Sequence, residues 1–176
     1  MYGIADKLTD SGQYPVLRMN NLDERGFWHL DDLKYTDNQP TKERQLRHGD
    51  FLFNRTNSME LVRKSAVVDF DFIGTWAGYL VRLRFNSELN PFYLRDVLST
   101  RHFRQTLSAM ARPAGGQANL NVEEFTSVAI PYFSPEKQAE IVATNEKERR
   151  TIQHLNNMSN NARISANQLL QKLWES

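Results

Sequence analysis

The chain is organised around one stretch, Gly49-Asp50-Phe51-Leu52-Phe53-Asn54-Arg55-Thr56-Asn57-Ser58-Met59-Glu60-Leu61-Val62-Arg63-Lys64. It opens with a Gly-Asp turn signal, continues as a short apolar strand, and ends in amides, hydroxyls and a guanidinium followed by two more cations. Such polar groups bond phosphate oxygens or base edges, and the cations neutralise phosphate. The same residues also suit a polar turn capped by its own side chains. From chemistry alone, both interpretations stay open.

Short strands are predicted on both sides of this stretch. Residues 14–19 and 65–68 are compact apolar runs, and residues 76–85 alternate apolar positions with arginine. A further short strand is expected at 128–130, before a proline. Several short strands with few helices predict an α+β fold, built on a twisted, mixed and mostly antiparallel sheet.

Two helices are predicted downstream. Asn90-Pro91 is a helix start, and apolar residues recur at near-helical intervals from there to about Arg112. Residues 113–117 hold a proline and two glycines and are expected to form a loop. Ser134-Pro135 begins a second helix that runs to the end of the chain. The expected domains are therefore residues 1–134 and a long helix over residues 135–176.

The long helix has coiled-coil spacing. Steps of four and three residues from Ile141 reach Leu173 over more than four heptads. Polar residues and alanines interrupt this seam, so we expect it to pack against a larger partner rather than one equal helix. A helix of ~40 residues is roughly 60 Å long and should protrude. An amphipathic helix folded back on its own domain is the alternative.

Composition excludes several classes of protein. The 22 basic and 21 acidic residues nearly cancel, but residues 81–134 hold more arginine than acid. The absence of cysteine and the scattering of the four histidines leave no metal-ligand spacing. No apolar run approaches the ~20 residues that cross a bilayer. We expect a cytoplasmic protein without a metal of its own.

Several blocks of sequence resemble one known family, the specificity subunits of type I restriction–modification systems. The run 49–64 is similar to the signature of those subunits, and Pro15-Val16-Leu17-Arg18-Met19-Asn20-Asn21-Leu22 resembles their opening strand. Further blocks resemble the segment after that strand and the family's closing elements: residues 31–35, 116–121, 130–131 and 136–142. These blocks occur in the family's order and cover nearly the whole chain.

The resemblance implies a DNA target-recognition domain followed by a helix that packs against the helix of a second half. It also implies a DNA adenine methyltransferase partner and a restriction and translocase partner, with S-adenosylmethionine, ATP and Mg²⁺ bound only by those partners. Two features depart from the family. Arg63 stands where glycine is usual, and the chain holds one recognition domain and one helix instead of two. We expect either a fragment, with a clipped start, or a half-subunit that dimerises.

The resemblance also assigns candidate DNA-binding residues. The first loop holds Asn54, Arg55, Thr56, Asn57, Ser58 and Lys64. Gln117 and Asn119 belong to a second loop beside it, and Arg18, Asn20 and Asn21 are expected to support both loops. Base readout is expected from residues 25–29 and 72–76. Arg82, Arg84, Arg101 and Arg104 are either phosphate contacts or ordinary solvated surface.

The stretches that resemble catalytic motifs each lack an essential part of the motif. Asn90-Pro91-Phe92-Tyr93 lacks the second proline of an adenine methyltransferase motif, and no glycine-rich nucleotide loop is present. Asp32-Leu33-Lys34 imitates a nuclease site only by spacing. We therefore expect a non-catalytic subunit that directs its partners to one half of a bipartite target. The alternative is a helix-mediated regulatory protein that replaces one half of a larger specificity subunit and reads no DNA.

Overall fold

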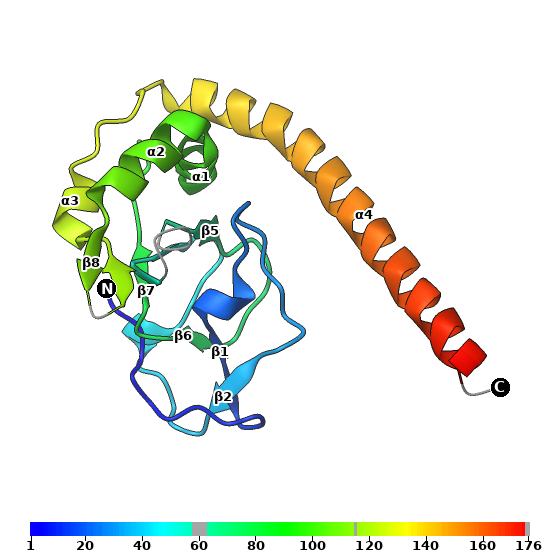
Figure 1. The fold of residues 1–176 in the computed structure, drawn as a ribbon. Coiled ribbons are helices and arrows are strands. Elements are labelled where there is room, and N and C mark those ends of the chain that lie inside the picture. Colours follow the sequence, from blue (N-terminus) through cyan, green and yellow to red (C-terminus); the bar gives the residue numbers. More distant parts are fainter. Residues whose placement is uncertain (58–62, 115, 175–176) are drawn as a thin grey trace. The chain divides into compact units, whose positions relative to one another are not determined.

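The computed structural model describes residues 1–57, 63–114 and 116–174. The chain divides into two compact units, Met1–Gln138 and Ala139–Ser176. The first unit holds small, mostly antiparallel sheets with three short helices, and the second belongs to one long helix, drawn from yellow to red in Figure 1. The predicted α+β class with a long C-terminal helix is confirmed.

The strands form three small sheets instead of the single sheet that was predicted. Each sheet has three strands, in the orders β2-β1-β6, β5-β3-β7 and β4-β9-β8. All pairs are antiparallel except β1 with β6. The bounds are β1 Tyr14–Leu17, β2 Lys34–Thr36, β3 Phe51–Asn54, β4 Thr56–Asn57, β5 Ser65–Val67, β6 Thr75–Trp76, β7 Leu80–Leu83, β8 Arg112–Ala114 and β9 Gln117–Asn119.

Strand β3 is buried on both faces, and this joins two apolar cores. Phe51 and Phe53 belong to one cluster of buried side chains, where Phe53 stacks on Phe125 with ring centroids 4.1 Å apart. Leu52, between them, points into a second cluster with Trp76. Alternate side chains of a strand point to opposite faces, so one four-residue strand contributes to both cores. The backbone of β3 pairs with β5 on one side and with β7 on the other, both antiparallel.

The two predicted helix starts, at Asn90-Pro91 and Ser134-Pro135, are found in the structure. The Asn90 side chain accepts a hydrogen bond from the backbone of Phe92 at 2.9 Å and caps α1 (Pro91–Ser99). The chain becomes extended at Thr100, so the predicted single helix is divided into α1 and α2 (Arg101–Met110). A short helix that was not predicted, α3 (Val122–Thr126), follows β9. The long helix α4 spans Pro135–Trp174.

Three local predictions are wrong. Residues 113–117 were expected to be a loop, but β8 and β9 pair there as a hairpin. Residues 76–85 were expected to be one strand, but β6 and β7 are separated by a turn. Residues 128–130 form no strand. Both strand errors concern runs whose pattern suits a strand, but backbone pairing with distant segments decides where a strand forms.

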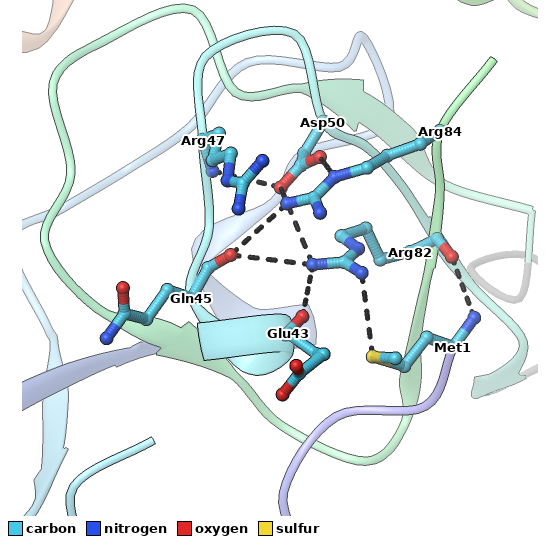
Figure 2. A network of polar contacts seen from close by, with 7 residues as sticks. All are labelled: Met1, Glu43, Gln45, Arg47, Asp50, Arg82 and Arg84. Atoms are coloured by element: carbon cyan, nitrogen blue, oxygen red, sulfur yellow. Dashed lines mark hydrogen bonds and ion pairs between the residues drawn. The ribbon is translucent and has the colours of Figure 1, made fainter. Parts of the chain in front are cut away.

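The turn before β3 is held by a polar network around Asp50, shown in Figure 2. The Asp50 carboxylate is buried and accepts hydrogen bonds from the Arg47 backbone and from the Arg84 guanidinium. Arg82 lies 3.9 Å from the same carboxylate and donates to the Glu43 carbonyl at 2.6 Å. A buried carboxylate with several charge-assisted donors ties this turn to β7.

Replacing Asp50 by asparagine should destabilise the first unit by about 3 kcal/mol, because Arg82 would remain buried without its counter-charge. This value is at the low end of the roughly 3–5 kcal/mol lost when a buried ion pair is broken, because Arg84 is 35% exposed and partly solvated. Urea unfolding monitored by tryptophan fluorescence measures the loss. The exposed Asp69 offers the matched control, since Asp69→Asn should change stability by less than about 0.5 kcal/mol. Equal effects of the two substitutions would contradict the assigned role of Asp50.

Helix α4 presents apolar side chains along its length. The exposed members are Ile152, Leu155, Met158, Ile164, Leu170 and Trp174. Polar and charged residues separate them, so the helix is polar on average and only weakly amphipathic. Among the described residues, no helix combines the length and apolarity that crossing a membrane requires.

Candidate nucleic-acid interface

Cationic side chains gather at one hollow of the first unit, which we call the cationic hollow. Its inner part is lined by five cations and one carboxylate: Arg25, Arg63, Lys64, Arg95, Arg104 and Glu24. A shallower part of about 620 Å³ shares Arg63 and Arg104 and adds Arg101. The cations come from four separate segments: the turn after residue 21, the approach to β5, and helices α1 and α2. Only the folded chain brings them together.

In the part of the chain that the structure describes, three of these cations are bonded to uncharged acceptors and to no carboxylate. Arg63 donates to the Ser108 hydroxyl at 2.6 Å, Arg104 to the Glu24 carbonyl at 3.0 Å, and Lys64 to the Leu22 carbonyl at 2.8 Å. These acceptors are uncharged. Within the described ranges, no carboxylate forms an ion pair with these three side chains. The hollow therefore carries a concentrated positive potential that suits a polyanion.

Lys64 is the most constrained of these cations. Desolvation lowers the pKa of Lys64 below its usual 10.5, while the nearby charges of Glu24 and Asp23 oppose that shift. The ammonium is thus held by the Leu22 carbonyl in a place where burial penalises its charge. An anion that entered the hollow would relieve this penalty.

The lowered pKa of Lys64 predicts a pH-dependent stability difference from Lys64→Met. Between the folded and unfolded pKa values the unfolded chain holds more protons, so the wild type should gain stability relative to the variant as pH rises toward 10.5. Urea unfolding of both proteins at several pH values from about 8 upward measures this. Lys42→Met, at an exposed lysine, is the control. A wild-type advantage that stays constant with pH would contradict the prediction.

Two residues of the predicted first loop have structural roles, which corrects their assignment. The Asn54 side chain has no exposed surface, and Thr56 is 6% exposed. The Thr56 hydroxyl donates to the Asn119 side-chain oxygen and joins β4 to β9. Both side chains belong to the protein interior, so direct DNA contact is not open to them in this conformation. Polar residues after a strand look alike in sequence whether they face solvent or the interior.

The predicted second loop does lie beside the first. Asn57 pairs with Ala118 in the β4–β9 ladder, next to the exposed Gln117. Ser58 falls outside the described residues. Asn21 is buried and supports the fold, since its amide donates to the carbonyls of His29 and Asp32 at 3.0 Å.

The other candidates divide between two surfaces. Lys64 lines the cationic hollow, whereas Arg55, Arg18 and Asn20 line a different groove. The structure therefore does not gather all the predicted residues into one site.

The four arginines predicted as phosphate contacts or solvated surface also differ in their positions. Arg101 and Arg104 line the cationic hollow. Arg84 is bound to Asp50. Arg82 is 7% exposed and stacks over Trp76 at 4.8 Å, so both interpretations are wrong for it. Its position alternates with apolar residues, a pattern that normally places a side chain in solvent.

Of the two stretches predicted to read bases, one reaches the cationic hollow and the other ends in the protein interior. Arg25, from residues 25–29, reaches the cationic hollow. From residues 72–76, Thr75 and Trp76 are buried in β6. Sequence reasoning missed Arg95, which lines the hollow while bound to Asp96 at 2.9 Å. An arginine inside an apolar helix pattern gave no signal of this.

Comparison with known proteins finds a related fold but no related sequence family. No family model and no curated protein matches the sequence. Among solved structures, six chains match. One of them has a TM-score of 0.57 and 18% sequence identity, over 83% of this chain and 33% of that chain. It belongs to a structure described as the "structural basis underlying complex assembly and conformational transition of the type I R-M system". This chain spans about a third of that chain's length, and the two share a fold.

Proposed function

We propose that the chain binds double-stranded DNA through the cationic hollow, as the specificity component of a type I restriction–modification complex. The observation that carries this proposal is the convergence of Arg25, Arg63, Lys64 and Arg104 from segments distant in sequence, with neutral acceptors for the last three. A surface of this kind binds a phosphate backbone well and provides most of the affinity. Two further findings support the same role: the sequence resemblance to specificity subunits and the shared fold.

In this proposal the chain performs no catalysis. It reads one half of a bipartite target and directs a DNA adenine methyltransferase and a restriction and translocase subunit to it. S-adenosylmethionine, ATP and Mg²⁺ are bound by those partners and not by this chain. The complex works in the cytoplasm. The exposed Gln117 is a side chain of the type that bonds base edges, and the arginines of the hollow set the position on the backbone.

Removing charge from the hollow should weaken duplex binding at any sequence. The double substitution Arg101→Gln with Arg104→Gln removes two exposed or half-exposed cations. The slope of log affinity against log salt should become shallower by about 1 for each lost phosphate contact. Fluorescence anisotropy with labelled random duplexes at several salt concentrations measures the slope.

Arg44→Gln is the matched control, because Arg44 is exposed in the short helix Lys42–Arg44 and lines neither part of the hollow. It should leave the slope unchanged. If the double variant keeps the wild-type affinity and slope, the hollow is not the DNA-binding surface. If the wild type prefers no duplex over bulk DNA with its methyltransferase partner present, the specificity role fails.

Helix α4 favours a second activity, association with another helix. Ile152 and Leu155, two neighbouring seam positions, are 39% and 58% exposed, which suits an apolar seam that is covered by a partner. Leu155→Asp should reduce the apparent mass in analytical ultracentrifugation, from a dimer toward a monomer. The exposed Asn157 gives the control substitution Asn157→Asp. Identical sedimentation of all three proteins as monomers would exclude self-association through this seam.

The same variants separate the proposed function from its alternative. A regulatory protein that replaces one half of a specificity subunit would lose partner capture through Leu155→Asp but would show no effect of the Arg101 and Arg104 substitutions on DNA. A DNA-reading subunit responds to both sets.

A further inference from the structure

A second groove of about 600 Å³ lies on the first unit and shares no residue with the cationic hollow. We call it the Arg55 groove. It is lined by Arg55, Arg18, Asn20, Asp6 and Tyr79, together with small and apolar residues. Its volume is within the range of small-molecule sites, roughly 300–1,000 Å³.

The Arg55 guanidinium is held in position without a hydrogen-bond acceptor among the described residues. Its backbone is fixed on both sides, since Arg55 N–H donates to the Tyr79 carbonyl at 3.2 Å and its carbonyl accepts from Leu120 at 2.7 Å. The guanidinium lies over the Tyr2 ring, 5.0 Å from the centroid. In the part of the chain that the structure describes, none of its N–H groups has a hydrogen-bond partner, and Nε is shielded from solvent. Buried donors of this kind normally find an acceptor.

Arg55 brings to the groove a positive charge that no described carboxylate pairs with, while Asp6 keeps its negative charge because its two donors are uncharged. Arg18 is bonded to the carboxylate of Asp32 at 2.8 Å and to its carbonyl at 2.7 Å. The Asp6 carboxylate is held by the Thr36 hydroxyl and the Asn38 amide, both at 3.0 Å. No carboxylate among the described residues pairs with Arg55. An anion would therefore meet one free, planar, bidentate donor here.

An aromatic platform lies beside this donor. The Tyr79 side chain is 52% exposed in the turn before β7, and the exposed Asn20 carries an amide on the same groove. We propose that the Arg55 groove binds one nucleotide whose base is unpaired, with the phosphate on Arg55 and the base against Tyr79. Phosphate pairing with arginine and base stacking on an aromatic ring are the two contacts by which proteins hold unpaired nucleotides. A free mononucleotide and an unpaired nucleotide within a strand share this chemistry.

Thymidine monophosphate and a labelled ten-residue oligothymidine test the proposal. Calorimetry measures the affinity for thymidine monophosphate, and fluorescence anisotropy measures the affinity for the oligothymidine. All proteins in this test carry Arg101→Gln and Arg104→Gln, which weaken binding in the cationic hollow. Arg55→Gln should lower the affinity tenfold or more, and Tyr79→Ala about fivefold or more. Binding of the mononucleotide as well as the oligonucleotide identifies a free nucleotide as a sufficient ligand. Binding of the oligonucleotide alone identifies an unpaired nucleotide within a strand.

Arg44→Gln and Tyr132→Ala are matched controls at exposed positions outside the groove and should leave both affinities unchanged. Circular dichroism melting checks that Arg55→Gln folds, and the surface variant Tyr79→Ala keeps the test valid if it does not. Unchanged binding in the Arg55 and Tyr79 variants overturns the proposal. So does inorganic phosphate binding as tightly as the mononucleotide without dependence on Tyr79. Because duplex binding is measured on other residues, either proposal can fail alone.

Discussion

The fold depends on a single strand that is buried on both faces. Phe51 and Phe53 fill one core and Leu52 fills the other, so neither core can form without β3. Burying such side chains contributes about 1.5–3 kcal/mol each before entropy is counted, and three of them lie in sequence. The strand begins at the Asp50 network. Beyond its end comes Arg55, whose side chain lines a groove.

This constraint explains why polar residues follow the strand into the interior. A chain that leaves a doubly buried strand is still inside the protein for several residues. Its backbone groups and the Thr56 hydroxyl find partners inside the protein, whereas Arg55 Nε has none among the described residues. The Asn54 backbone donates to the Lys64 carbonyl at 2.7 Å, and Thr56 bonds Asn119. The first of these bonds positions Lys64 at the cationic hollow, and the second joins β4 to the hairpin of β8 and β9. The stretch from residue 49 to residue 64 thus positions candidate binding residues more than it supplies them.

Local signals predicted much of the fold. The Asn90 cap, the helix start at Ser134 and the core of β3 were all visible, because a cap or a turn depends on residues within a few positions. The division at Thr100 and the β8–β9 hairpin were not visible. The hairpin is local, but its strand β9 also pairs with β4, which lies about sixty residues upstream.

The candidate site was predictable only in part, for the same reason. Lys64 was named, and Arg101 and Arg104 were named as one of two possibilities. The convergence of these cations with Arg25 and Arg95 arises from four segments and has no local sign. Arg82 misled in the opposite direction. Its alternation with apolar neighbours is the pattern of a solvent-facing residue, but the Glu43 carbonyl and the Asp50 carboxylate hold it in the interior.

The stacking of Phe53 on Phe125 also governs when this chain can fold during synthesis. The two rings are separated by more than seventy residues of chain. The Arg55 carbonyl likewise accepts its hydrogen bond from the backbone N–H of the distant Leu120. Contacts with such long sequence separation close late and slowly. A nascent chain that has exposed β3 but not yet α3 presents phenylalanines without their cover, a state in which chaperone binding and aggregation compete with folding. The core of the first unit should therefore close only after residue 125 has left the ribosome, and the unit is complete only with Gln138, which is buried and bonded to Asn90 and Glu88.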